Sequence, residues 1–458
     1  MRYTPRQLST LIARSPDFLA ALRNISWLAT DRVVQMALGL TVGAWVARYL
    51  GPEQFGLLSF ATAVVAIFSS VSTAGLEGVA VREIVRRPHD ANTVLGSAFS
   101  AQLIGGLAAY ILAVTFTIAL RPGDSEARLV VAIIGFGSIL RATEVMTYWF
   151  ESHTRSKRPV LAKNANYVAM AILKIWLILI EAPLLAFVWL TLLGTVSTGF
   201  SLWFVYRQSG QKISKWHASV RTTCSLLSQS WPLALSGVTV MIQARLDQVM
   251  LGSIIGDGEV GQYSVAMQLI DAVTFIPAII VSTFAPHIVR AKAVDRDLYH
   301  SWLLNVYRLM VLLFLAIAAP TLLFGEYFVL VLFGPDYARA GALLPLFVLR
   351  LFFAYFGIAR TLFIMNEGLF KHALVTTSAG TIVNALLNYM LIPAFQSEGA
   401  IVAAIVSFAI TIFIMDAFRP DTRINFKLML HAVLTPNKTG FMRLLGATPP
   451  PPTTPAGT

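Results

Sequence analysis

Apolar runs long enough to cross a bilayer recur along almost the whole chain, and they limit the possible folds more than any other feature. A helix that crosses the hydrocarbon needs roughly 20 mostly apolar residues. None of the runs alternates apolar and polar residues as the strands of a membrane barrel do. The sequence therefore predicts an all-α, polytopic membrane protein. We place twelve spans, at residues 24–47, 56–80, 94–120, 129–150, 160–181, 183–206, 231–255, 261–286, 302–325, 342–365, 372–393 and 399–418.

The composition agrees with a membrane protein and excludes several other classes. Of the 458 residues, 56% are hydrophobic and 13% are charged, whereas a soluble domain has about 25% charged residues. The net charge of +12 would suggest nucleic acid in a soluble chain, but in an apolar chain it indicates loops that face an anionic membrane surface. Cys224 is the one cysteine, so an intramolecular disulfide is excluded, and the histidines lack the spacing of a metal site.

The basic residues between the spans predict the orientation. The loops on the side of the two termini carry 24 of the 35 Lys and Arg residues, the opposite loops carry 4, and the other 7 lie within spans. By the positive-inside rule, both termini are expected in the cytoplasm. The longest outer loop covers only 326–341, so we expect the protein to act within the bilayer. The N-terminal stretch Met1–Arg23 lacks the apolar core of a cleavable signal peptide.

Short matches between the halves predict an internal duplication. Leu50-Gly51 is followed by Gly56, Ser59 and Ala61, and Leu251-Gly252 is followed by Gly261, Ser264 and Ala266. Six spans per half give the halves one orientation, so their symmetry axis would run along the membrane normal. We predict five parts of the chain: a cytoplasmic arm at 1–23, an N-lobe at 24–206, a cytoplasmic loop at 207–230, a C-lobe at 231–418 and a cytoplasmic tail at 419–458. The proline-rich last ten or so residues of the tail are predicted to be disordered.

Ionisable residues within the spans are the candidates for function, because a charge at the bilayer centre costs about 2.5–3.5 kcal/mol on insertion scales. Arg141 lies near the middle of its span, with Glu144 at i+3, where an ion pair can form. Lys174, Arg245 and Arg350 have no obvious partner within their own helix turns, and we expect them to line a polar cavity. The alternative for Arg141 and Glu144 is a structural pair.

Other polar residues in the spans could serve either ligand binding or packing between helices. Asn384 and Asn388 share a helix face and could bind sugar hydroxyls or another helix. Arg360 lies near a cytoplasmic end, where its side chain is expected to reach the interface, and Asp416 is also placed at the inner interface. Four acids are candidates for coupling transport to a proton or sodium gradient: Asp271, Glu144, Asp247 and Asp31.

The sequence carries no catalytic signature. A phosphate-binding loop, HExxH and GxSxG are all absent. The sequence therefore predicts neither an enzyme nor a pump that hydrolyses ATP itself, and no cofactor is expected.

Several segments identify a family. The run ARYLGPEQFG at residues 47–56 resembles polysaccharide-export flippases of the Wzx type, in the multidrug/oligosaccharidyl-lipid/polysaccharide (MOP) superfamily. The resemblance covers about residues 20–418, and further segments that carry it are Asn24–Trp27, Gly75–Gly78, Val81–Glu83, Leu332–Tyr337 and Glu398–Ala404.

The resemblance implies a two-lobed, MATE-like fold of twelve helices with alternating access. It also implies a substrate, a short oligosaccharide on undecaprenyl pyrophosphate that moves from the cytoplasmic to the periplasmic leaflet of a bacterial inner membrane. The product would serve O-antigen, capsule or exopolysaccharide synthesis, with a polymerase and a chain-length regulator as candidate partners. The resemblance assigns no residue to the sugar site.

Two alternatives remain open. A MATE-like multidrug or cation antiporter would share the fold, but acids should dominate its cavity. A membrane polysaccharide polymerase or acyltransferase would need catalytic residues in an outer loop, whereas the outer loops are small and the histidines lie at or near the cytoplasmic side.

Overall fold

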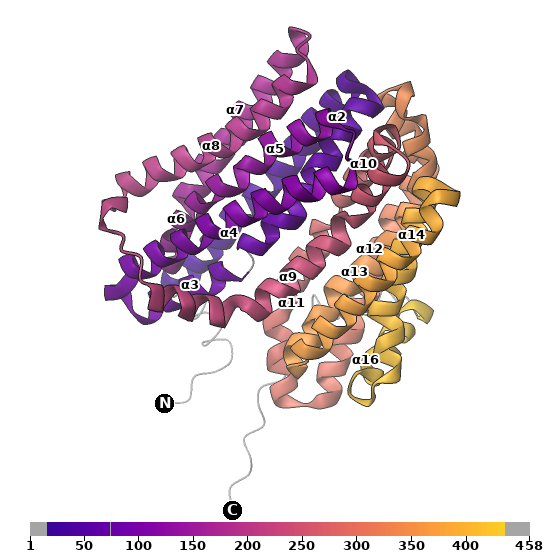
Figure 1. Ribbon diagram of the computed structural model, residues 1–458. Coiled ribbons are helices and arrows are strands. Elements are labelled where there is room, and N and C mark those ends of the chain that lie inside the picture. The colour runs from indigo at the N-terminus through magenta and orange to yellow at the C-terminus, as the bar shows by residue number, and fades with distance from the viewer. Residues whose placement is uncertain (1–15, 74, 436–458) are drawn as a thin grey trace, which may run out of the picture. The chain divides into compact units, whose positions relative to one another are not determined.

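The computed structural model describes residues 16–73 and 75–435, except for the side chains of residues 16–34, 37 and 73. Every regular element among these residues is a helix, which confirms the all-α prediction (Figure 1). The proline-rich end of the tail, predicted to be disordered, lies outside the described residues.

The helices up to residue 215 cover the six spans predicted for the N-lobe. A short 3₁₀ turn, η2, separates α5 from α6 within the fourth of these spans. The elements are α2 (Pro16–Thr73), α3 (Leu76–Arg86), η1 (Pro88–Asp90), α4 (Ala91–Leu120), α5 (Ser125–Leu140), η2 (Arg141–Val145), α6 (Met146–Ser152), α7 (Lys157–Leu179), α8 (Leu184–Gln208) and η3 (Ile213–Lys215).

The remaining helices cover the six spans predicted for the C-lobe, with one further helix, α16, in the predicted tail. These elements are α9 (Val220–Ile254), α10 (Asp257–Asp271), α11 (Phe275–Val294), α12 (Arg296–Phe333), η4 (Pro335–Tyr337), α13 (Ala338–Glu367), α14 (Phe370–Ala409), the π-helical turn η5 (Ile410–Ile414), α15 (Met415–Phe418) and α16 (Pro420–Leu434).

Two long helices each contain a break that separates two predicted spans. In α2 the break is at Gly51, whose φ of 72° favours glycine, and Pro52 follows it. In α14 the break is at Gln396, with a φ of 50°. Eight helical stretches of the described residues are long and apolar enough to cross a membrane. Neither α7 nor α9 is among the eight, because polar side chains lower their hydropathy.

The chain divides by its internal contacts into two compact units, Met1–Ser264 and Val265–Thr458. Within the first unit, α9 packs on α2, α3 and α4. Within the second, α12 packs on α11, α13 and α16. The division into lobes at loop 207–230 stays a prediction.

Small residues let the helices of the first unit approach closely. A Cβ atom added at Gly106 of α4 would lie 2.5 Å from the Ser138 carbonyl oxygen of α5. Nearby, the hydroxyls of Ser69 and Ser138 are 2.6 Å apart. Because side chains larger than these would separate the helices, the glycines and serines of α2, α4 and α5 are packing residues.

The second unit encloses a buried ion pair that fastens α16 to the bundle. The Arg360 guanidinium donates to both carboxylate oxygens of Asp416, at 2.9 and 2.6 Å, and His372 Nε2 is 2.9 Å from the same carboxylate. From α16, Asn425 donates to Asp416 and accepts a hydrogen bond from Tyr307. Arg360 is only 5% exposed, so the prediction that it reaches the interface is wrong, because a carboxylate from another helix satisfies it inside the unit.

Candidate functional site

A cavity with a volume of about 610 Å³ lies in the first unit, between the first half of α2, η2, α7 and α8. Its lining follows one face of each long helix. On α2 the lining positions are 35, 38, 39, 42 and 43, on α7 they are 163, 166, 167, 170, 171 and 174, and on α8 they are 190, 191, 194, 195 and 198. These spacings repeat every three to four residues, as one face of a helix does.

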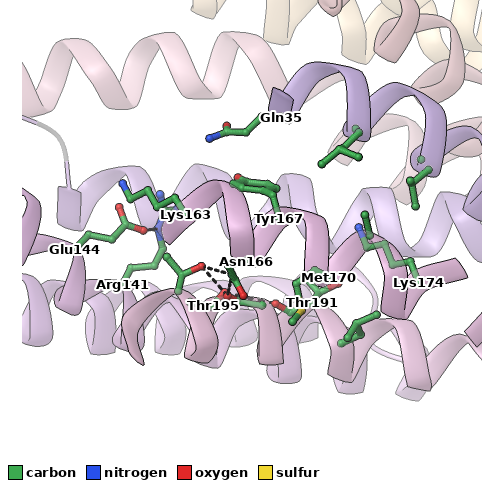
Figure 2. Close-up of a pocket in the computed structure, with 18 residues that line it drawn as sticks. Gln35, Arg141, Glu144, Lys163, Asn166, Tyr167, Met170, Lys174, Thr191 and Thr195 are labelled. Carbon is green, nitrogen blue, oxygen red and sulfur yellow. Dashed lines mark hydrogen bonds and ion pairs between the residues drawn. The ribbon is translucent and has the colours of Figure 1, made fainter. Parts of the chain in front are cut away.

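The charged groups of this cavity come from α7 and η2. Figure 2 shows Arg141, Glu144 and Lys163 together at one end, and Lys174 toward the other. Among the described side chains, three cations and one carboxylate therefore line the cavity. Since the interactions of these charges are stronger away from bulk water, the lining favours an anionic ligand.

The 3₁₀ turn η2 places Arg141 and Glu144 on the same side of the chain. A 3₁₀-helix has about 3.0 residues per turn, so side chains at i and i+3 eclipse. Arg141 Nε lies 3.2 Å from Glu144 Oε1, and the two side chains are 44% and 34% exposed. The pair is therefore open to the cavity, and a bound anion can compete with Glu144 for the guanidinium.

Close packing holds this turn against α8. A Cβ atom at Gly199 would lie 2.7 Å from Thr143 Oγ1, so a larger residue there would displace η2. The Asn166 side chain of α7 is likewise hydrogen-bonded to α8. It donates to Thr198 and to the Gly194 carbonyl, and it accepts a hydrogen bond from Ser197. These contacts position Lys163 and Arg141 rather than bind a ligand.

A second cavity, with a volume of about 570 Å³, shares Arg141, Glu144 and Lys163 with the first. Its other polar lining comes from α3, α4 and α6, through Glu77, Gln102, Thr147, Tyr148 and Glu151. The shared residues make the two cavities neighbours along α7 and η2. By the predicted topology, the second cavity lies toward the cytoplasmic ends of its helices.

A compact ion-pair cluster, here called the Arg121 cluster, lies at the predicted outer ends of α4 and α9. The Arg121 guanidinium donates to both Asp257 oxygens, at 2.8 and 3.1 Å, and to Asp124 at 3.1 Å. It also donates to the Gly252 carbonyl and lies 3.8 Å from the centre of the Phe60 ring. The cluster thus joins the α4–α5 turn to the α9–α10 turn, on opposite sides of the predicted lobe boundary.

The candidates on α9 are satisfied by hydrogen bonds. Asp247 is 1% exposed and accepts a hydrogen bond of 2.7 Å from the Tyr263 hydroxyl of α10. Arg245 is half-buried and donates to Gln248, which donates to Ser264. This arrangement ties α9 to α10, so packing accounts for these side chains. Their roles in a cavity or in coupling stay predictions.

The candidates of the second unit lie in its interior or at a helix end. Arg350 is 8% exposed and lies between the Phe347 and Phe408 rings, about 5.7 and 5.6 Å from their centres. Asn384 and Asn388 are fully buried, and Asn388 donates to Asn384 at 3.3 Å. That Arg350 lines a polar cavity stays a prediction.

The two remaining coupling candidates are placed differently. Asp271 is exposed, and it ends α10 just before the turn into α11, whereas the sequence predicts a continuous span there. Asp31 belongs to α2, but its side chain lies outside the described residues.

Sequence reasoning missed Lys163, Glu77, Glu151 and the Arg121 cluster. The first three lie close to the predicted span ends, where a charge needs no special explanation. One available signal was the helical spacing from Lys163 through Asn166 and Tyr167 to Lys174, which marks a polar face on α7.

One protein family matches more than half of the chain. A family model described as "Polysaccharide biosynthesis protein" matches residues 21–292. No curated protein matches the sequence.

Solved structures of transporters have a similar fold. The lipid II flippase MurJ in an inward-closed conformation has a TM-score of 0.69 and 12% sequence identity, over 94% of each chain. An inward-facing multidrug resistance MATE transporter of the MOP superfamily has a TM-score of 0.66 and 16% identity, over 92% of this chain and 98% of that chain. A MOP superfamily transporter from Pyrococcus furiosus has a TM-score of 0.57 and 16% identity, over 93% and 96%. These likenesses confirm the predicted MATE-like membrane fold.

Proposed function

Since the chain belongs to the polysaccharide biosynthesis protein family, we propose that it is a flippase for oligosaccharides linked to undecaprenyl pyrophosphate. The observation that carries this proposal is the cavity lined by Arg141, Lys163 and Lys174. The resemblance of the ARYLGPEQFG run to polysaccharide-export flippases supports the same substrate class.

The chemistry of the headgroup explains why cations are needed. A pyrophosphate with attached sugars cannot cross hydrocarbon unaided, because burying its charges and hydroxyls without partners costs several kcal/mol for each group. Arg141 can pair with phosphate through two parallel hydrogen bonds, while Lys163 and Lys174 act as point charges. The hydroxyls of Thr191 and Thr195 on α8 and the exposed Tyr167 ring supply polar and flat surfaces suited to a sugar.

Transport by alternating access fits this arrangement. The headgroup would enter from the cytoplasmic side while the prenyl chain stays in lipid, and it would leave when the predicted outer ends separate. In this scheme the protein is a multi-pass transporter of a bacterial inner membrane with cytoplasmic termini, and it performs no covalent chemistry. A polymerase and a chain-length regulator would use the exported units.

A leaflet assay tests the proposal. Purified protein in liposomes is offered a defined undecaprenyl pyrophosphate glycan, and the glycan that reaches the far leaflet is measured by its accessibility to an added glycosidase. We expect wild-type protein to equilibrate the glycolipid, and Lys163→Gln and Lys174→Gln to slow it at least tenfold. The matched control is Arg86→Gln, which removes an exposed cation of α3 outside the cavity lining.

Two results would contradict the proposal. One is equal glycolipid movement in protein-containing and protein-free liposomes. The other is undiminished movement in both lysine variants, because the cavity would then not be the path. Transport of a cationic drug in place of the glycolipid would favour the antiporter alternative.

A further inference from the structure

The second cavity holds two carboxyl groups from segments far apart in the sequence. Glu77 lies in the first turn of α3, and Glu151 lies near the end of α6. Both residues line this cavity, and their carboxyl groups interact with each other. An ionised carboxylate can only accept hydrogen bonds, so a hydrogen bond between the two groups would need a proton on one of them.

An independent feature of the same cavity also points to a bound donor. Gln102 of α4 is 2% exposed, and its Nε2 donates to the Tyr148 hydroxyl at 2.7 Å. Its Oε1 atom is buried and has no hydrogen-bond partner among the residues that the structure describes. Buried polar atoms are nearly always hydrogen-bonded, and Gln102 lines the cavity into which Glu77 and Glu151 project. An oxygen in this position needs a donor, and a protonated carboxyl group or a water molecule can provide one.

The charges around the pair connect it to the proposed substrate cavity. Arg141, Lys163 and Glu144 line both cavities. Tyr148 is the other titratable group of the lining. The stretches of α4 and α9 that pack on α3, at 94–102 and 226–234, contain no acid or base. The carboxyl pair therefore shares a cavity with the two cations that an anionic headgroup could bind, and one of them, Lys163, interacts electrostatically with Glu151.

We propose that Glu77 and Glu151 form a proton-binding site whose occupancy is linked to anion binding in the neighbouring cavity. This inference rests on the proposed function. When a pyrophosphate pairs with Arg141 and Lys163, it withdraws positive charge from the carboxyl pair, so the pair takes up a proton more readily. By reciprocity, a protonated pair carries less negative charge and strengthens binding of the anion.

The linkage predicts how binding depends on pH. The probe is a soluble, short-chain prenyl pyrophosphate linked to one sugar, because such a diester does not titrate near neutral pH. For wild-type protein in detergent, we expect the affinity to fall as the pH rises. Uptake of one proton limits this fall to about tenfold per pH unit.

Neutral variants separate linkage from a structural role. Glu151→Gln and Glu77→Gln keep the shape of the side chain and mimic its uncharged form. Each should bind the probe with the affinity that wild type has at low pH, with little pH dependence. Glu83→Gln, on the same helix but outside the cavity lining, should keep the wild-type profile. A pH profile that is unchanged in both cavity variants overturns the proposal.

Two further measurements distinguish failure of the proton site from failure of the proposed function. Infrared spectra of wild type and Glu151→Gln without ligand should differ in the carboxylic acid C=O band, and no difference at any pH overturns the proton site. If the band is present but the probe does not bind wild type, the proposed function fails and the proton site stands. Replacing sodium with choline should leave the wild-type affinity unchanged, whereas a loss that both variants abolish would identify a sodium site instead.

Discussion

The Arg121 cluster should hold the predicted outer ends of the helices together, and replacing Asp257 with Asn tests this directly. Arg121 and Asp257 are 9% and 19% exposed, so their ion pair is largely shielded from water. The substitution removes the negative charge and one of two hydrogen bonds, while Asp124 and the Gly252 carbonyl still accept from Arg121. A hydrogen bond to a charged group contributes about 1.5–3 kcal/mol, which corresponds to a shift of about 10- to 150-fold toward the outward-open state of the proposed transport cycle.

Thiol labelling measures this shift. In a Cys224→Ser background, Ser59→Cys introduces a reporter at a position that is 8% exposed and one turn beyond Gly56, which packs against the α9–α10 turn. A membrane-impermeant thiol reagent is added to intact cells. We expect Asp257→Asn to increase the labelling rate of the reporter at least tenfold.

Asp124→Asn is the matched control, because it removes an ion pair from the same guanidinium without separating α4 from α9. Asn also keeps the cap that Asp124 forms at the start of α5. The reasoning is refuted if Asp257→Asn labels at the wild-type rate, or if Asp124→Asn labels equally fast.

Four other predictions concern transport, topology and stability. Arg141→Gln should reduce glycolipid flipping about tenfold or more at normal protein abundance. Arg141→Lys should restore flipping only in part, because lysine lacks the planar fork of arginine. Loss of folded protein in both variants would indicate a structural pair. Cys224 should resist an impermeant thiol reagent in intact cells and react after permeabilisation, and rapid labelling from outside would reverse the orientation. Asp271→Asn should abolish accumulation driven by a pH gradient in liposomes if Asp271 couples protons, and accumulation equal to wild type excludes that role. Gly106→Leu should destabilise the first unit by about 1–3 kcal/mol through overpacking, measured as a lower midpoint of thermal unfolding, and an unchanged midpoint would contradict the close contact with α5.

The helices could be predicted because their signal is local. A run of apolar residues fixes the position of a span whatever the rest of the chain does. Arg141 and Glu144 could be paired for the same reason, since a spacing of three residues places them together on one helix. Their exposure to a cavity could not be predicted, because it depends on α7, α8 and the 3₁₀ turn.

Pairs of side chains from different helices could not be predicted from the local sequence in this way. Asp247 has the sequence features of a buried functional acid, yet its partner Tyr263 comes from the next helix. The sequence position of Arg360 predicts the interface because nothing in the sequence marks Asp416, which lies 56 residues away, as its partner. Glu77 and Glu151 looked like ordinary helix ends for the same reason.

The two segments that suggest an internal repeat pack on each other in the structure. Gly56 and Gly261 occupy equivalent positions in the two matching segments, each followed by serine at i+3 and alanine at i+5. In the structure these segments pack on each other, and a Cβ atom at either glycine would overlap the partner backbone, at the Asp257 carbonyl for Gly56 and at the Pro52 carbonyl for Gly261. The contact is reciprocal, as expected where two copies of one segment meet about a local two-fold axis. Under the predicted duplication, selection for this close approach would preserve glycine in both copies while the surrounding residues diverge, and this would explain why the matching residues lie beside the Arg121 cluster. Under the proposed alternating access, the same contact would have to separate whenever the predicted outer ends open, so the glycines and the ion pair would act on one step of the proposed cycle.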